Sequence, residues 1–444
     1  MEGRLLLKNC SIFSPDGRVR DRMAVLIDGG KVAAVEDDAA VPARPGDWSV
    51  NCDGRLLAPG LVDCHTHLVN AQLLPLSGEL LLRSPRSRHA LQQRLDALLT
   101  PAEVEVLTAF AVGKALRAGV TMLVEHLHCP ADAGAALAAQ ARVAERLGVR
   151  LNNCHATNSL DGEAASFREL DGNVAYAESM KGHPLVRPAL GFHASFSTED
   201  SLLQRVGRER ERLGVGAVYH LAETEDDLTT TFTRHGRRIV PRLESFGLLG
   251  PGVVAAHARA VDRSESARLS ESRTLIALGP RFNLVAEPGG GGFEAVLAHQ
   301  NLLGLGTSGG GLLWGELISA FAGVIQIARA GRLLDPDGFM SQILFGGPAE
   351  LCSLLYGAPS GTVQAGALAD LVLYDHVPAQ EDPGGLTPHL LMQLGSVRPA
   401  WVIVAGRVVV REGQLPGHDY VELAREAART LEALWKRAGP PAAA

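Results

Sequence analysis

Two histidines separated by a single residue, His65 and His67, close the apolar segment PGLVDCHTH at residues 59–67. Side chains two positions apart on a β-strand point to the same face, so both imidazoles are expected to face one point. Imidazole nitrogen is a common ligand of Zn²⁺ and Fe²⁺. This pair is therefore predicted to form half of a metal site, although paired histidines also occur as surface or core residues.

A second chemical signal is the sequence HLAE at 220–223, which ends another apolar run. His220 is predicted to be a third metal ligand. Glu223 lies just beyond it, and a carboxylate beside a metal-activated water can transfer protons to the substrate. The alternative for Glu223 is a glutamate at a helix N-terminus, which the helix dipole favours and which does not require His220.

Three further histidines end apolar runs in the same way, namely His257 after two alanines, His193 after Gly-Phe and His126 after Val-Glu. A lone histidine at a strand end is more often a satisfied structural residue. Because His257 follows the other histidines in order along successive strands, we expect it to be catalytic and to polarise the water or the substrate. His126 and His193 are expected to line the pocket and to bind the substrate.

These residues need a scaffold that brings the ends of several strands together. Short apolar segments alternate with helical segments through the middle of the chain, and eight such βα units predict an α/β fold with a closed parallel (β/α)8 TIM barrel. The alternative is an open doubly wound sheet. The eight strand candidates span residues 57–64, 121–126, 150–156, 186–193, 217–220, 253–257, 274–278 and 301–306.

The predicted helices carry recognisable terminal signals. Thr100, Pro101 and Glu103 offer an N-cap hydroxyl, a proline in the first turn and a capping-box carboxylate for a helix that runs to about residue 119. Further helices are expected over 131–147, from about 197, over 225–246 with a break at Pro241, and over 420–437.

Both ends of the chain show the pattern of short β-strands instead. Residues 1–57 contain apolar runs joined by turns such as Asp28-Gly29-Gly30, which is a hairpin signal. Similar runs return over 363–415. We expect these two segments to form one small β-sandwich domain beside a barrel at 58–362, followed by a C-terminal helix and tail at 416–444.

The composition argues against several classes of partner and location. The net charge of −7 disfavours a nucleic-acid or anionic-membrane binder. The six cysteines form no CxxC pair, and buried free thiols in a reducing compartment are the usual interpretation. No apolar run approaches the roughly 20 residues of a membrane span. We expect a cytoplasmic protein with a small-molecule substrate and no nucleic-acid or membrane partner, and a homodimer stays open as its assembly.

Motifs along the whole chain resemble the amidohydrolase superfamily, in its cytosine deaminase and chlorohydrolase branch, and are similar to the SsnA-type aminohydrolases. The matching stretches are PGLVDCHTH (59–67), TMLVEHLHCP (121–130), GVRLNNCHATNSLDG (148–162), GFHASFS (191–197), YHLAE (219–223), VAAHA (254–258), LGLGTSGG (303–310) and GTVQAGALADLVLYD (361–375).

This resemblance implies one divalent metal ion, Zn or Fe, with His65, His67 and His220 as its ligands. It implies that Glu223 transfers protons and that His257 hydrogen-bonds the attacking water or the developing oxyanion. The reaction it implies is hydrolysis of a C–N bond other than a peptide bond, in a small nitrogen-containing heterocycle or an amidine.

Two positions depart from the family pattern. The aspartate that the family carries after the eighth strand is replaced by Ser308, and the usual Pro-x-Ser-Asn after the seventh strand is PRFN at 280–283. Ser308 and Asn283 are expected to contact the substrate. A neutral hydroxyl is a weak ligand and no comparable base, so two hypotheses remain. The chain is an active hydrolase with Glu223 as its base, since three histidines and a water can hold Zn²⁺, or it is a catalytically degenerate binding or assembly subunit.

Overall fold

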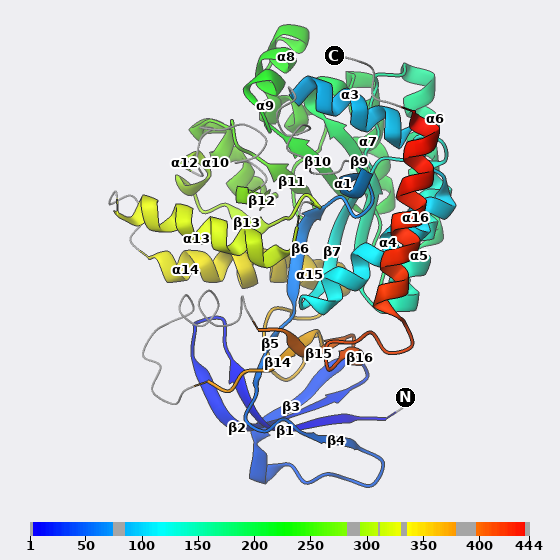
Figure 1. Ribbon diagram of the computed structural model, residues 1–444. Coiled ribbons are helices and arrows are strands. Elements are labelled where there is room, and N and C mark those ends of the chain that lie inside the picture. Colours follow the sequence, from blue (N-terminus) through cyan, green and yellow to red (C-terminus); the bar gives the residue numbers. More distant parts are fainter. Residues whose placement is uncertain are drawn as a thin grey trace.

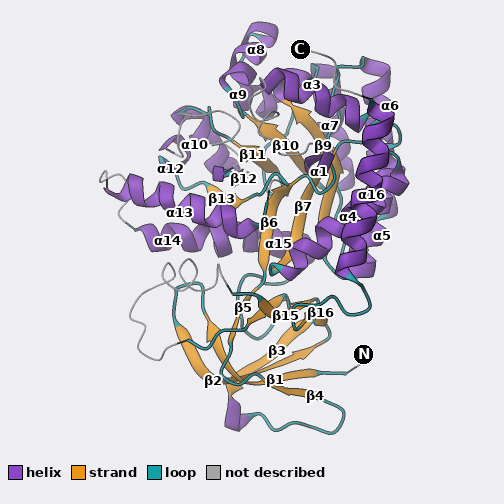
Figure 2. Ribbon diagram, in the orientation of Figure 1, coloured by secondary structure: helices purple, strands orange, loops and turns teal. Residues whose placement is uncertain are grey.

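The computed structural model describes residues 3–73, 85–281, 294–309, 311–329, 335–378 and 397–439. Eight parallel strands alternate with helices through the middle of the chain, and the helices lie outside the strands (Figure 1). This larger part therefore has α/β architecture of the TIM-barrel type. A second sheet, built from both ends of the chain, lies beneath it (Figure 2). None of the described helices is both long and apolar enough to cross a membrane.

The eight parallel strands fall close to the predicted segments. Their bounds are β6 (Leu61–Thr66), β7 (Val120–Leu127), β8 (Arg150–His155), β9 (Ala189–Ala194), β10 (Gly216–Leu221), β11 (Val254–His257), β12 (Leu275–Leu278) and β13 (Leu302–Leu305). β6 to β8 pair in one sheet and β9 to β13 in another. Between them, Leu151 N donates to Leu185 O at 3.0 Å and His193 N donates to Thr157 O at 2.8 Å. These bonds join the sheets along β8 and β9.

Side chains as well as backbone join β13 to β6. Ser308 N, just beyond β13, donates to His65 O at 3.0 Å. The Thr307 hydroxyl and N–H donate to the Asp63 carboxylate at 2.6 and 3.0 Å. An acidic side chain within β6 therefore holds the last parallel strand beside the first.

One buried apolar cluster draws side chains from β6 to β12, and residues 351–368 close its lower end. On β7 its members Met122 and Val124 are two positions apart, so His126 is the next residue in the same register. On β10 the member Val218 likewise precedes His220. On these two strands the period of two that buries small apolar residues at mid-strand also directs an imidazole inward near the carboxyl end. The cluster contains Val62, Cys64, Met122, Val124, Cys154, Ala189, Val218, Val254, Leu275, Ala277, Leu351, Cys352, Ala358 and Leu368.

The helices cover the outside of the strands. Their bounds are α1 (Asn70–Leu73), α3 (Pro85–Asp96), α4 (Pro101–Arg117), α5 (Ala133–Leu147), α6 (Glu163–Ser179), α7 (Asp200–Leu213), α8 (Glu225–His235), α9 (Ile239–Ser245), α10 (Arg263–Ser272), α12 (Glu294–Leu297), α13 (Leu313–Arg329), α14 (Pro336–Ser341), α15 (Gly347–Tyr356) and α16 (Tyr420–Ala438). The capping box predicted for α4 is confirmed, because Thr100 accepts from Glu103 N and the Glu103 carboxylate accepts from Thr100 N.

The break predicted at Pro241 lies elsewhere. α8 ends at His235 and is capped by Gly236, whose φ of 65° suits glycine in the left-handed region, and α9 begins at Ile239. Pro241 is the third residue of α9. In the first turn of a helix the backbone N–H has no intrahelical partner, so proline costs nothing there.

The sheet built from the chain ends has the order β16-β15-β14-β5-β1-β2-β3, and β4 pairs with β1. Its strands are β1 (Leu5–Phe13), β2 (Val19–Asp28), β3 (Lys31–Asp37), β4 (Trp48–Asn51), β5 (Leu56–Pro59), β14 (Leu371–Tyr374), β15 (Pro399–Val404) and β16 (Arg407–Arg411). β5 and β14 pair antiparallel, so the two ends of the chain meet at the centre of the sheet. The turn at Gly29 and Gly30 joins β2 to β3 as predicted, with φ of 55° and 77°.

The strand predicted at 57–64 is divided between the two parts of the molecule. β5 ends at Pro59 in the lower sheet, and β6 begins at Leu61. Gly60 lies between them, where a Cβ would meet the Thr121 side chain at 2.3 Å. Because only glycine fits this approach without displacing Thr121, Gly60 separates β5 from β6 within the single strand predicted over 57–64.

A buried ion pair connects the two parts. Arg150 Nε of β8 lies 2.6 Å from Asp370 Oδ2, and both side chains are almost fully buried. Asp370 Oδ1 also accepts from Ala405 N at 2.8 Å, and the Arg150 guanidinium lies over the Tyr356 ring at 4.2 Å. Since a buried charge without its partner is costly, this pair fixes how the lower sheet meets the parallel strands.

We predict that Arg150→Met lowers the free energy of unfolding by about 3–5 kcal/mol, because Asp370 is left buried and uncompensated. Adding Asp370→Asn should restore part of this loss. The control is Lys436→Met, which breaks the exposed pair with Glu432 and should leave the free energy of unfolding nearly unchanged. Urea unfolding measures all three, and equal losses from Arg150→Met and Lys436→Met contradict the assignment.

Candidate metal centre

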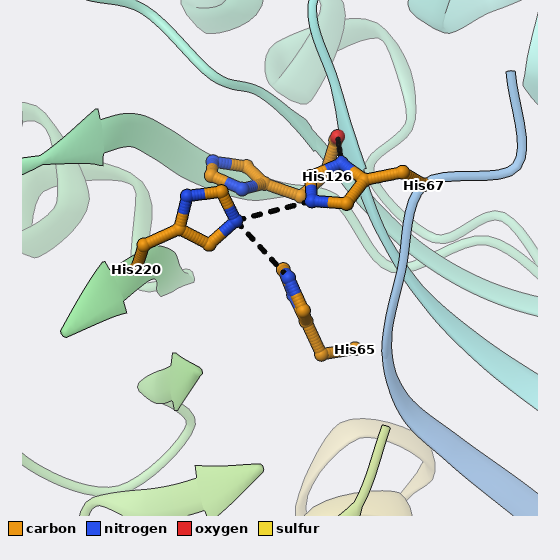
Figure 3. Close-up of side chains that lie close together, drawn as sticks. All are labelled: His65, His67, His126 and His220. Carbon is orange, nitrogen blue, oxygen red and sulfur yellow. Dashed lines mark hydrogen bonds between the residues drawn. The ribbon is translucent and has the colours of Figure 1, made fainter. Parts of the chain in front are cut away.

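Three imidazole nitrogens converge at the carboxyl ends of β6 and β10. His220 Nε2 lies 3.1 Å from His67 Nε2 and 3.2 Å from His65 Nε2 (Figure 3). Two ligands at roughly 2.0–2.1 Å from a tetrahedral Zn²⁺ are about 3.3 Å apart. The structure therefore brings the three predicted ligands together at the spacing that a shared metal ion requires.

The orientation of His67 fits the same interpretation. Its Nδ1 lies 2.6 Å from the backbone oxygen of His126, so Nδ1–H donates there and the lone pair stays on Nε2. Metal-bound histidines characteristically donate their other ring nitrogen to a carbonyl or carboxylate. The hydrogen bond to His126 therefore orients His67 Nε2 toward His220 before any metal binds.

Burial keeps these imidazoles in the neutral form that binds metals. Desolvation lowers the pKa of His65 and His220 well below the usual value, and neighbouring histidines lower it further. Desolvation also lowers the pKa of His67. Metal binding requires neutral imidazole, so the residues present fit a divalent cation such as zinc.

Two buried carboxyl groups support this arrangement from behind, and neither was among the predicted site residues. Asp63 accepts from His65 N at 3.4 Å in addition to its bonds with Thr307. Glu125 accepts from Leu68 N at 2.8 Å, directly after the histidine pair. Burial raises the pKa of Asp63 to about 7 and that of Glu125 to about 8. In the sequence, an acidic residue among the apolar residues of a predicted strand could have indicated that Asp63 and Glu125 have a structural role in the site.

The predicted catalytic residues lie beside the three imidazoles. Glu223 is half-buried in the turn between β10 and α8, and its charge acts to raise the pKa of His67 against the effect of burial. Burial raises the pKa of Asp227 to about 7, and the Glu223 carboxylate contributes to this shift. His257 ends β11 with its ring centroid 5.2 Å from that of His220 and 5.6 Å from that of His65.

The backbone around these residues is strained. Ala222, His257, Ala258 and Ser308 have φ of 45°, 75°, 50° and 47°, the left-handed region that costs a non-glycine residue about 1–3 kcal/mol. All four follow or end parallel strands. Hydrogen bonds hold them there, including Ala258 N to Leu221 O at 2.8 Å. Such outliers gather at functional sites, where the surrounding structure fixes side chains in unusual directions.

The predicted substrate-binding residues lie in different places. His126 belongs to the imidazole cluster itself. His193 is the penultimate residue of β9. Its ring centroid lies 5.2 Å from that of His220, and its Nδ1 lies 2.8 Å from Ser197 Oγ. Ser308 is buried just beyond β13. Asn283 lies outside the described residues.

A second cluster of ligand-type side chains, His128, His155 and Glu169, lies behind the first. His155 Nε2 accepts from Cys129 N at 3.0 Å, and its Nδ1 lies 3.1 Å from Thr157 Oγ1. Because both nitrogens of His155 have hydrogen-bond partners, this cluster is a polar network that orders the loops after β7 and β8.

Comparison with known proteins agrees with the geometry. The chain is 27% identical to a 5-methylthioadenosine/S-adenosylhomocysteine deaminase of Syntrophobacter fumaroxidans over 96% of this chain and 98% of that protein. It is 25% identical to a 5'-deoxyadenosine deaminase of Methanopyrus kandleri, over 97% and 99% of the two chains.

Solved structures show the same fold. An adenosine deaminase from Xanthomonas campestris with bound zinc superposes with a TM-score of 0.82 at 22% identity, covering 97% of this chain and 98% of that one. An atrazine chlorohydrolase from Arthrobacter aurescens complexed with zinc gives 0.80 at 19% identity, over 96% and 100%. Residues 56–409 match the Amidohydrolase family, and the chain belongs to that family.

Proposed function

We propose that this chain is a metal-dependent aminohydrolase that removes an amino group from a nitrogen-containing heterocycle, with zinc as its metal. The observation that carries this proposal is the convergence of three neutral imidazole nitrogens, from His65, His67 and His220, at the carboxyl ends of two parallel strands. The relatives with deaminase names support an adenosine-type compound as the substrate class.

The residues around the three imidazoles divide the remaining work. Zinc, when bound, polarises a water molecule and lowers its pKa. Glu223 accepts a proton and delivers it to the leaving amino group, because it is half-buried just after β10 and its charge acts on His67. His257 hydrogen-bonds the atom that develops negative charge. His193, Ser308 and Asn283 contact the substrate.

We also infer that the two parallel sheets form one closed (β/α)8 barrel at about 60–362. The Asp63–Thr307 hydrogen bonds on one side, the β8–β9 bonds on the other and the single inner apolar cluster support closure. The lower sheet, from the chain ends, is proposed to be a small β-sandwich domain, with residues 416–444 as a C-terminal helix and tail.

The cellular setting is proposed on chemical grounds. All six cysteines are free and buried, which favours a reducing compartment, and we propose the cytoplasm. The net charge of −7 supports a small molecule, and not a nucleic acid, as the partner. A homodimer remains a proposal for the assembly.

Ser308 supports a second candidate function. Ser308 stands beyond β13 where the family carries an aspartate, so the site lacks the base that this carboxylate would supply. A chain of this fold can act as a binding or assembly subunit without turnover. The two candidates differ in what happens when a carboxylate is introduced at this position.

We predict that the double variant His65→Ala/His67→Ala loses bound zinc, because two of three converging ligands are absent. Metal analysis of the purified protein should show one zinc per chain in the wild type and none in the variant. The control is His299→Ala/His418→Ala, which removes two imidazoles outside the cluster. Unchanged zinc content in the first variant contradicts the proposed centre.

We predict that Ser308→Asp tightens zinc binding, since a charged oxygen replaces a neutral hydroxyl beside His65. Aspartate tolerates the φ of 47° at this position better than most residues do. If the serine at position 308 is the main cause of low activity, the restored base should raise the rate of deamination by about 10²–10⁴-fold. The matched control is Ser308→Asn, which has the same shape without the charge.

The other outcomes of this substitution are equally informative. A loss of deamination shows an enzyme adapted to serine, with Glu223 as its base. If neither zinc affinity nor activity changes and the wild type holds no metal, the hydrolase proposal is wrong and the binding-subunit candidate replaces it.

A further inference from the structure

His126 has a buried imidazole that the hydrogen bonds of the described structure do not explain. The residue is fully buried on β7, and neither ring nitrogen has a hydrogen-bond partner among the described residues. Buried polar atoms in native proteins nearly always have partners, and each exception needs an explanation such as a bound ion. A bound ion or a water molecule would supply the partner that these two nitrogens need.

The position of the ring indicates what that ligand is. The ligand atoms of His65, His67, His126 and His220 all lie within 4.8 Å of one another. The His126 ring centroid lies 4.9 Å from that of His220 and 5.6 Å from that of His67, and Figure 3 shows the three rings side by side. Ligand atoms that each lie roughly 2.0–2.1 Å from one tetrahedral zinc ion are about 3.3 Å apart, so zinc binding would draw the His126 nitrogen toward the other three.

We propose that His126 is a fourth protein ligand of the metal ion, so that β6, β7 and β10 together supply four imidazoles. The proposal rests on the metal dependence argued above and extends it to a residue first expected to bind substrate.

His126 then serves the metal site twice. Its backbone oxygen accepts from His67 Nδ1 and fixes that ring, while its own side chain enters the cluster. Four neutral imidazoles leave the full double positive charge of the ion in place. A zinc ion held by four imidazoles would take water as a fifth ligand, since zinc sites can become five-coordinate.

The competing role for His126 is a contact with substrate or water, and the chain offers a matched control for it. His193 also lies near the end of a parallel strand, with its ring centroid 5.2 Å from that of His220. Its Nδ1 faces Ser197 Oγ at 2.8 Å, and it lies outside the cluster of ligand atoms. His126→Leu and His193→Leu therefore make the same chemical change on either side of His220.

The experiment is zinc binding and zinc X-ray absorption on the full chain. Loss of a residue that hydrogen-bonds a metal ligand, without binding the metal itself, lowers metal affinity by about 10–100-fold. We expect His126→Leu to lose more than this, because a direct ligand is absent while the backbone contact to His67 remains. We expect His193→Leu to change zinc affinity by less than 10-fold. Zinc absorption should report four imidazoles in the wild type and His193→Leu, and three in His126→Leu.

The unfolding midpoint of the metal-free protein separates ligation from folding. Because the His126 ring has no described partner to lose, His126→Leu should unfold at the wild-type midpoint without zinc and lose only the stabilisation that zinc provides. If this variant does not fold, His126→Gln replaces it. The number of imidazoles that X-ray absorption reports for the wild type tests the proposal without any variant.

Three imidazoles in the wild type, or less than 100-fold loss of affinity in the folded variant, overturns the ligand assignment and leaves the metal-dependent function standing. A wild type that binds no zinc overturns both.

Discussion

The structure depends on one unfavourable contact, the approach of neutral imidazole nitrogens to one another in a buried space. His220 Nε2 lies 3.1–3.2 Å from the Nε2 atoms of His65 and His67, and hydrogen bonds cannot satisfy all three, since a proton on one nitrogen serves one neighbour well. A divalent cation at their centre turns this repulsion into attraction. The strand register, the buried acids and the strained turns around the site all serve to maintain this arrangement.

The supporting residues act through the backbone of the histidine pair. Asp63 joins β6 to the segment after β13, and Glu125 holds the chain directly after His67 from β7. Both acids are buried, so their hydrogen bonds are made in a medium of low polarity where a lost partner is expensive. The left-handed residues Ala222 and His257 add strain that the neighbouring strands must hold. The paired strands beneath the site hold both the buried acids and the left-handed residues in place.

Local patterns predicted much of this arrangement because they depend on neighbours in sequence. The positions of His65, His67 and His220 at the ends of apolar runs predicted that they lie together, the capping box began α4 at Pro101, and the motifs identified the family correctly. The break at Gly60 and the partners of Asp63 and Glu125 could not be predicted in this way. They depend on contacts between segments far apart in the chain, such as the approach of Thr121 to Gly60, which no single segment encodes.

The exchange of an aspartate for Ser308 changes the charge of the site more than its shape. Neutral imidazoles leave a bound divalent ion uncompensated, and two unit charges 4 Å apart at an effective dielectric constant of 20 interact by about 4 kcal/mol. Glu223 is the half-buried carboxylate whose charge already reaches His67. In the proposed mechanism Glu223 both balances the ion and carries the proton. On that proposal, the negative charge of the centre lies after β10 and not after β13, and the acid–base chemistry depends on one side chain.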